Sequence, residues 1–101
     1  MRSVIKTHAY KRDFTQESSG KNRTALTNDL PDVIAMLAAD TVIPAKYRDH
    51  MLTGNWAQHG ECHIKPDLLL VYMKIGETTD SDEEESGELR LVRLGSHSKL
   101  F

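Results

Sequence analysis

Apolar residues recur three and four positions apart in one segment of the chain, at Leu30, Val33, Ile34 and Leu37. This spacing places the four side chains on one face of an α-helix. Asn28 and Asp29 precede the segment as candidates for the N-cap, and Pro31 is tolerated within the first helical turn. The pattern therefore predicts one amphipathic helix that begins near residue 30.

Three later segments have the pattern of β-strands. Residues 59–65 alternate polar and apolar side chains, and residues 67–75 are dense in strand-forming residues. Residues 88–94 alternate charged with apolar side chains, which is typical of a strand with one buried face. Pro66 and Asp67 favour a turn between the first two strands. We therefore expect an antiparallel three-stranded meander.

The remaining segments have weaker patterns. Residues 4–10 mix apolar and polar side chains with β-branched content, which predicts a short strand. Residues 11–24 have almost no apolar face beyond Phe14 and include a Ser-Ser-Gly break, so we expect at most a short helix followed by a loop. Residues 45–55 predict an ordered surface loop. The tail over residues 95–101 is short and polar until its last two residues.

Length and composition fit a single domain over residues 1–101. Its expected class is α+β, with an N-terminal strand, one or two helices, the meander and a short C-terminal tail. A chain of this size buries a core but no deep pocket, so we expect any active site in a shallow surface cleft.

The single cysteine and the lengths of the apolar runs indicate the cellular compartment of the protein. Cys62 is the single cysteine, and no apolar stretch near the N-terminus resembles a secretory signal, which together indicate a reducing, cytoplasmic environment. The longest apolar run, from Leu68 to Met73, is far shorter than the roughly 20 residues that a membrane-spanning helix needs. We therefore expect no membrane association.

The charge is unevenly distributed along the chain. Thirteen basic and fifteen acidic residues give a formal charge of −2, which by itself argues against a nucleic acid as partner. Residues 76–88, however, carry −7, and the remainder carries +5, which is compatible with binding RNA. Residues 76–87 predict a disordered acidic hairpin loop that is solvated, with a docking or autoinhibitory role as the alternative.

A metal site is one candidate for the chemistry, because His59, Cys62, His63 and Asp67 lie within nine positions. On a strand, Cys62 would point away from the other three, and no second Cys or His pair completes a structural zinc site. We therefore expect no metal. Cys62 is also a candidate nucleophile, but no oriented base is evident, and a small half-buried side chain is the simpler interpretation.

Four short motifs carry a resemblance to a known family. They are Tyr47-Arg48-Asp49-His50, then Leu52-x-Gly54-x-Trp56, then His63-x-x-Pro66-Asp67 before the apolar strand Leu68-Leu69-Leu70-Val71-Tyr72, and Arg93-x-Gly95-Ser96-His97-x-x-Leu100-Phe101. In this order and spacing they resemble the YafQ branch of the RelE/ParE superfamily of bacterial toxins. The resemblance runs from about Pro44 to the C-terminus, and residues 1–40 fit in layout more than in motif.

The resemblance implies a RelE-like fold and a ribosome-dependent endonuclease that cuts messenger RNA by attack of a 2′-hydroxyl, with no metal or cofactor. The positions that match the family's active site are His50, His63, Asp67, His97 and Phe101, with Trp56 and Arg93 beside them. We expect His97 to be the general acid. The group that orients and deprotonates the 2′-hydroxyl is expected among His50, His63 and Asp67, and Asp67 could instead hold the tautomer of His63.

Three other roles are expected in RNA binding. Arg93 is the candidate that stabilises phosphate charge, with an exposed strand residue as the alternative interpretation. Phe101 is expected to stack on a base. Trp56 is equally compatible with a core position and with the site.

The resemblance also implies partners. They are a cognate antitoxin protein, with which a monomeric toxin assembles into a hetero-oligomer, and the 70S ribosome with its mRNA. The lysine-rich first helix usual for such toxins is absent; Lys11, Arg12, Lys21 and Arg23 surround the Ser-Ser-Gly break instead. Two alternatives stay open: a ParE-like poison of DNA gyrase that cleaves no RNA, and an inactive family member that only binds antitoxin.

Overall fold

The computed structural model describes residues 1–76 and 87–101 of the chain. Apart from its two terminal glycines, the predicted acidic loop lies outside the described residues. The strands are β1 (Ser3–Lys6), β2 (His50–Met51), β3 (His59–Lys65), β4 (Leu68–Ile75) and β5 (Glu88–Gly95). The helices are α1 (His8–Ser18), α2 (Arg23–Asn28), α3 (Leu30–Ala38) and α4 (His97–Leu100), with 3₁₀ turns η1 (Ala45–Tyr47) and η2 (Gly54–Trp56). In this part of the chain no helix has the length and apolar character needed to cross a bilayer.

The predicted meander forms the centre of a wider sheet. The strand order is β1-β5-β4-β3-β2, and β3, β4 and β5 pair antiparallel as predicted. The sheet has five strands rather than three, because β1 adds parallel to β5 and the short β2 adds antiparallel to β3. The α+β class and the N-terminal strand are confirmed.

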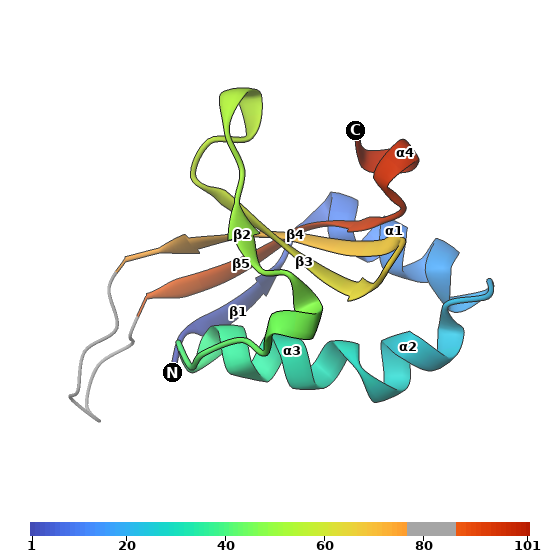
Figure 1. The fold of residues 1–101 in the computed structure, drawn as a ribbon, viewed down its shortest axis with the longest axis horizontal. Coiled ribbons are helices and arrows are strands. Elements are labelled where there is room, and N and C mark those ends of the chain that lie inside the picture. The colour runs from blue at the N-terminus through green and yellow to red at the C-terminus, as the bar shows by residue number, and fades with distance from the viewer. Residues whose placement is uncertain (77–86) are drawn as a thin grey trace.

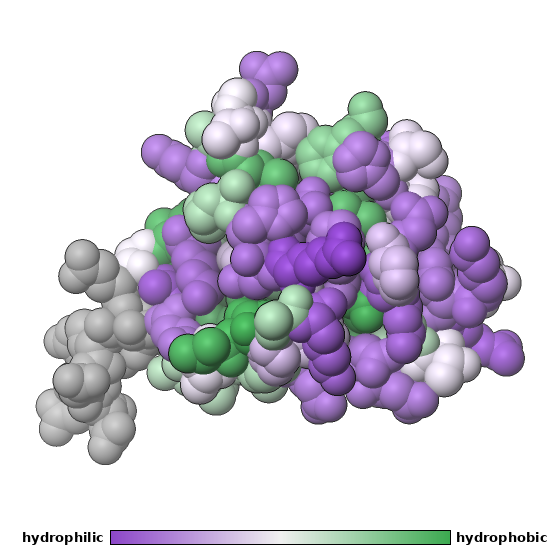
Figure 2. All heavy atoms as spheres, in the orientation of Figure 1, coloured by the Kyte–Doolittle hydropathy of each residue, from purple (hydrophilic) through white to green (hydrophobic). Residues whose placement is uncertain are grey.

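The two faces of the sheet are covered differently. One face packs against the helices and holds the main core, with members such as Tyr10, Val33, Leu37, Leu70 and Leu91. The opposite face, called the open face below, carries a smaller cluster of Leu69, Val71 and Leu100, with Leu52, Trp56 and Val92 against it. Figure 1 shows α2 and α3 on one side of the sheet, and η2 and α4 on the other. The molecular surface in the same view is mostly hydrophilic, with small apolar patches (Figure 2).

The N-terminal third differs from the prediction. The first strand ends at Lys6, and Thr7 caps a helix of eleven residues where only a short one was expected. The Thr7 hydroxyl accepts a hydrogen bond from the N–H of Tyr10 at 3.2 Å and donates to the carbonyl of Leu91 at 2.8 Å. Tyr10 and Asp13 are buried on the side of α1 that contacts β5. Tertiary packing therefore outweighs the weak helix propensity of this segment.

Other segments predicted to be irregular contain short elements. Residues 45–55 include η1 and the short β2, and α2 begins at Arg23, inside the predicted loop. The tail forms the single turn of α4, in which the Ser96 side chain accepts from the N–H of Lys99 at 3.2 Å and Leu100 is buried. The amphipathic helix at residue 30 is confirmed as α3, with Asp29 at its N-cap position and a proline in the first turn.

Candidate active site

The pairing of the strands places polar side chains on the open face of the sheet. Directly opposite residues of antiparallel strands share a face. His50 of β2 is opposite Glu61 of β3. Glu61 is in turn opposite Val71 of β4, which is opposite Arg93 of β5. His63 lies two residues after Glu61 and therefore belongs to the same face.

A buried carboxylate lies between the two histidines. Glu61 Oε1 is 2.9 Å from His63 Nε2 and 3.6 Å from His50 Nε2, and only 5% of Glu61 is exposed. The two imidazole rings are 6.2 Å apart between centroids. Because a carboxylate accepts, His63 donates to it from Nε2. Glu61 therefore fixes the ring of His63 and lies within ion-pair distance of a protonated His50.

The two histidines differ in their access to solvent. His63 is 19% exposed, and its Nδ1 atom is buried without a hydrogen-bond partner among the described residues. His50 is 49% exposed and donates from Nδ1 to the carbonyl of Arg48 at 2.7 Å. This bond leaves the lone pair of a neutral His50 on Nε2. Of the two rings, His50 is the better placed to accept a proton from a ligand.

Among the described residues, no hydrogen bond joins Asp67 to His63. The Oδ1 atom of Asp67 accepts a hydrogen bond from the backbone N–H of His97 at 3.1 Å. His63 Nε2 is hydrogen-bonded to Glu61 instead, so the role expected for Asp67 in holding the His63 tautomer stays a prediction. Asp67 instead links the β3–β4 turn to the start of α4, and in this way it fixes the backbone that carries His97.

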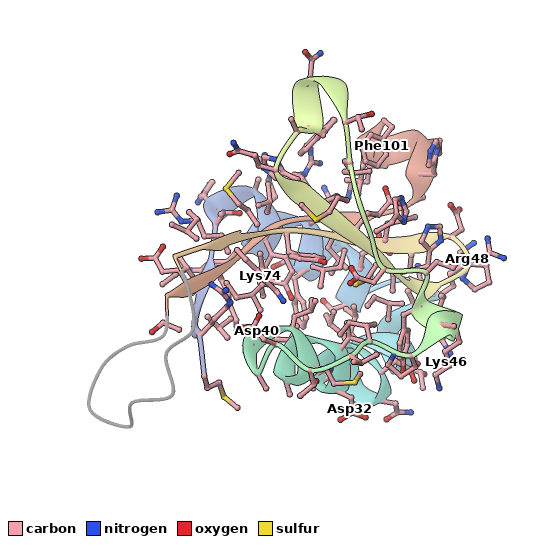
Figure 3. The ribbon with its side chains drawn as sticks, turned by 60° about the vertical axis from the view of Figure 1, so that its left-hand side comes forward. Asp32, Asp40, Lys46, Arg48, Lys74 and Phe101 are labelled. Carbon is pink, nitrogen blue, oxygen red and sulfur yellow. The ribbon has the colours of Figure 1, made fainter. Side chains whose placement is uncertain are left out.

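Aromatic rings extend from α4 to β3. The ring of His97 is 5.3 Å from that of Phe101, and Phe101 is 5.5 Å from Trp56. Trp56 is also 5.3 Å from His59, in an edge-on arrangement. Trp56 packs against the cluster of the open face, whereas Phe101 is 47% exposed. Trp56 thus packs between the open-face cluster and Phe101, and Phe101 remains accessible for stacking. Figure 3 shows Phe101 at the C-terminal end of α4.

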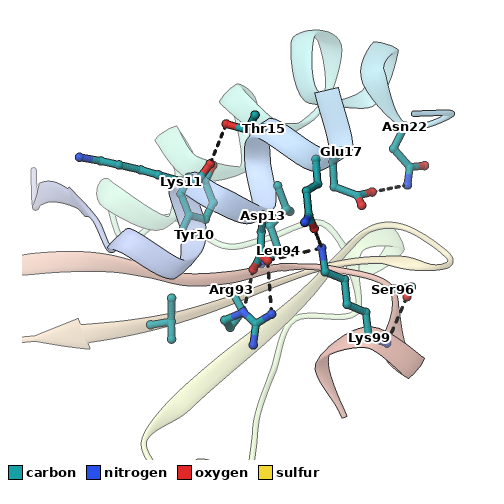
Figure 4. A network of polar contacts seen from close by, with 12 residues as sticks. Tyr10, Lys11, Asp13, Thr15, Glu17, Asn22, Arg93, Leu94, Ser96 and Lys99 are labelled. Atoms are coloured by element: carbon teal, nitrogen blue, oxygen red, sulfur yellow. Dashed lines mark hydrogen bonds and ion pairs between the residues drawn. The ribbon is translucent and has the colours of Figure 1, made fainter. Parts of the chain in front are cut away.

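Arg93 is held by a carboxylate of α1 (Figure 4). Its Nε and a terminal nitrogen donate to Asp13 at 2.7 and 3.3 Å, and the N–H of Leu94 donates to the same carboxylate at 3.0 Å. Lys99 Nζ lies 3.4 Å from Asp13 and donates to Gln16 at 2.6 Å. Asp13 therefore ties α1 to both β5 and α4.

The network sets the charge state of Asp13. Burial raises the pKa of this carboxyl, but the hydrogen bonds from Arg93 and Leu94, with the charges of Arg93 and Lys99, outweigh it and hold the pKa below its ordinary value. The hydrogen bond to Asp13 likewise raises the pKa of Arg93. The Arg93 side chain is 27% exposed, so it is oriented by Asp13 and still reaches the surface.

The family model of YafQ, a bacterial toxin of type II toxin–antitoxin systems, matches residues 2–101. The chain belongs to the YafQ family. An mRNA interferase toxin YafQ of Escherichia coli strain K12 is 35% identical over 75 residues, which cover 73% of this chain and 71% of the relative. Two solved structures are similar over the whole chain. A copper-bound mutant toxin from Helicobacter pylori has a TM-score of 0.77 at 32% identity and is covered completely. YafQ in the E. coli DinJ–YafQ complex has a TM-score of 0.76 at 26% identity, with 99% of that chain covered.

The metal ligands considered for this YafQ-family chain do not converge. Among residues 1–76 and 87–101, no group of three His, Cys, Asp or Glu side chains is arranged to hold a metal ion. Cys62 is fully buried and donates to Asp49 at 3.3 Å. Burial, together with the nearby charge of Asp49, raises the pKa of the Cys62 thiol, which therefore stays protonated. This state does not suit a nucleophile.

Two carboxylates of this YafQ-family site, Glu61 and Asp13, were not among the residues predicted from the sequence. Glu61 had a usable signal, since a residue two positions before His63 on a strand must share its face. Asp13 had none, because its partner Arg93 is 80 positions away and the intervening fold decides the contact.

Proposed function

We propose that this YafQ-family toxin is an endoribonuclease that cleaves messenger RNA on the 70S ribosome without a metal ion or cofactor. The observation that carries the proposal is the exposed His50 beside the Glu61–His63 pair, on the sheet face that also bears Arg93. The E. coli relative is named an mRNA interferase, which supports the same activity. Since ribosomes translate in the cytoplasm, the proposed substrate lies there.

The proposed reaction begins at the 2′-hydroxyl of the nucleotide before the cleaved bond. His50 Nε2 accepts the hydroxyl proton while O2′ bonds to phosphorus. Glu61, 3.6 Å from that nitrogen, faces the imidazolium that forms. Proton transfer of this kind contributes roughly 10²–10⁴-fold to rate. His63 is a positioning residue in this scheme, because it orients Glu61.

The second half of the proposed reaction takes place at α4. The bond between phosphorus and O5′ breaks as His97 donates a proton to O5′, giving a 2′,3′-cyclic phosphate and a free 5′-hydroxyl. Arg93 stabilises the charge on the phosphorane. His63 is opposite Leu69, and Leu69 is opposite Gly95, so β5 delivers α4 to the same end of the sheet.

A cognate antitoxin is the proposed protein partner. YafQ of E. coli is crystallised with DinJ in a toxin–antitoxin complex whose toxin chain has this fold. We propose that the present chain is likewise held inactive in a hetero-oligomer with its antitoxin, and that the free toxin acts as a monomer.

The test is to map mRNA ends after adding the purified toxin to programmed ribosomes. The proposal expects new 5′-hydroxyl ends at defined codons and no inhibition of gyrase supercoiling. If ribosome-bound mRNA stays intact while supercoiling is inhibited, the chain is a ParE-type gyrase poison. If neither occurs and antitoxin still binds, it is an inactive family member.

A further inference from the structure

A cleft opens beside His63 at the end of the sheet. It has a volume of about 210 Å³ and lies between η1 and the β3–β4 turn, lined among others by Lys46, Tyr47, Arg48, His63, Lys65 and Pro66. We call it the basic cleft. Figure 3 shows Arg48 beside this end of the sheet and Lys46 below it, with Phe101 of α4 on the other side. The basic cleft therefore adjoins the proposed site on the side away from α4.

The basic cleft has an excess of positive charge. It contains three cations and one carboxylate, Asp29, which pairs with Lys65 Nζ at 3.0 Å. Lys46 Nζ lies 5.0 Å from the ring centroid of Tyr47, and this contact leaves its charge uncompensated. The guanidinium of Arg48 makes no hydrogen bond or ion pair with residues 1–76 or 87–101. Two cationic side chains thus remain available to an anion.

Arg48 has an unusual backbone that connects the basic cleft to His50. Its φ is 48°, in the left-handed region that disfavours side chains with a Cβ. Its carbonyl accepts the 2.7 Å hydrogen bond from His50 Nδ1. A glycine would adopt this positive φ more easily than an arginine. The conformation of the turn therefore does not account for an arginine at this position. Strained conformations of this kind cluster at binding and catalytic sites.

We propose that the basic cleft binds a second backbone phosphate of the RNA, the one on the 5′ side of the nucleotide whose 2′-hydroxyl attacks. This inference rests on the proposed function. His50 faces that 2′-hydroxyl and His97 faces the leaving O5′, so the strand enters from the His50 side. Its preceding phosphate then lies toward Arg48 and Lys46. The contact adds substrate affinity and sets the register of the RNA over His50.

The first experiment measures binding without any cleavage. A fluorescent single-stranded RNA is titrated at several salt concentrations with wild type, Arg48→Gly, Lys46→Gln and the control Lys21→Gln. Glycine adopts the positive φ of position 48 without strain, so the melting temperature of Arg48→Gly should match that of wild type. Losing one phosphate contact lowers the slope of log affinity against log salt by about 0.7. We expect this decrease for the two cleft variants only. An unchanged slope in both overturns the proposal even if the toxin cleaves mRNA.

The second experiment places the phosphate. Ribosome-bound mRNAs carry a neutral methylphosphonate at the linkage on the 5′ side of the attacking nucleotide, or at the linkage on the 3′ side of the leaving nucleotide. The 5′ substitution should raise KM of the wild type roughly tenfold with little change in kcat. On this substrate, Arg48→Gly should have the same KM as the wild type. Additive losses, or a loss only with the 3′ substitution, contradict the proposed position. Absence of any cleavage refutes the proposed function and leaves the first experiment to decide on the cleft.

Discussion

Glu61 of β3 accepts a hydrogen bond from His63 Nε2 at 2.9 Å, within a single strand and on the open face of the sheet. This pair makes the contact that the family resemblance suggested as an alternative for Asp67 and His63. Because the carboxylate is buried, it has little freedom to move, and the nearby His50 is oriented from two sides, by Glu61 and by the carbonyl of Arg48. The proposed base is thus held before substrate binds.

Replacing Glu61 by glutamine tests this orientation. Gln keeps the size of the side chain but removes its charge, so the contacts with both imidazoles weaken. A hydrogen bond to a charged group contributes about 1.5–3 kcal/mol, which corresponds to a decrease of roughly 10–100-fold in kcat. The measurement is the rate of mRNA cleavage on programmed ribosomes.

The matched control is Asp32→Asn, which also removes one negative charge. Asp32 lies on an exposed side of α3, far from the open face (Figure 3). The cleavage rate of Asp32→Asn should equal that of wild type. A wild-type rate for Glu61→Gln as well would show that Glu61 has no part in positioning His50.

Asp13 should make stability dependent on acid pH. Its pKa is lowered in the folded protein, so its stabilisation is fully present above the unfolded value of about 3.9 and is lost as pH falls through the lower folded value. Asp13→Asn should decrease the free energy of unfolding by about 1–3 kcal/mol at pH 7. The difference from wild type should shrink below about pH 4.

Urea denaturation at a series of pH values measures this effect. Glu17→Gln is the control on the same helix, since the Glu17 carboxylate accepts a hydrogen bond from Asn22 and forms no ion pair with residues 1–76 or 87–101. A destabilisation by Asp13→Asn that is the same at pH 3 and pH 7 would contradict a lowered pKa of Asp13 in the folded state.

Gly60 of β3 leaves room for the ring of Tyr72 on the neighbouring strand β4. A Cβ at this position would overlap the Cζ atom of Tyr72, whose hydroxyl donates to Asp49 next to His50. Gly60→Ala should destabilise the fold by about 1–3 kcal/mol, because the tyrosine ring must move. Gly20→Ala is the control, with only one backbone atom 3.8 Å from the added Cβ. Equal melting temperatures for the two variants would disprove this packing argument.

The proposed reaction uses histidines and an arginine in place of a metal. Dialysis against a chelator should therefore leave cleavage unchanged, and added copper or zinc should not increase it. The copper-bound H. pylori relative makes this measurement informative. If dialysis abolishes cleavage and one metal restores it, the reaction depends on that metal and the metal-free acid–base mechanism is wrong.

The meander and the helix at residue 30 could be predicted because their apolar positions repeat at a fixed period, which a sequence displays directly. The extent of α1 could not, since Tyr10 and Asp13 become buried only when β5 lies beside them. Likewise, Trp56 and Phe101 meet through the packing of α4, which no local pattern encodes. The family motifs supplied the candidate residues, and the strand register supplied their partners.

In the proposed mechanism, His97 protonates the leaving O5′ while His50 removes the proton of the 2′-hydroxyl. This mechanism is tested by comparing two ribosome-bound mRNAs, one with the normal 5′-oxygen and one with a bridging 5′-sulfur at the cleaved bond. A thiolate leaves without protonation, so sulfur should restore His97→Ala to nearly the wild-type rate while His50→Gln stays slow. Equal losses for His97→Ala on both substrates would contradict the role of His97 as the general acid.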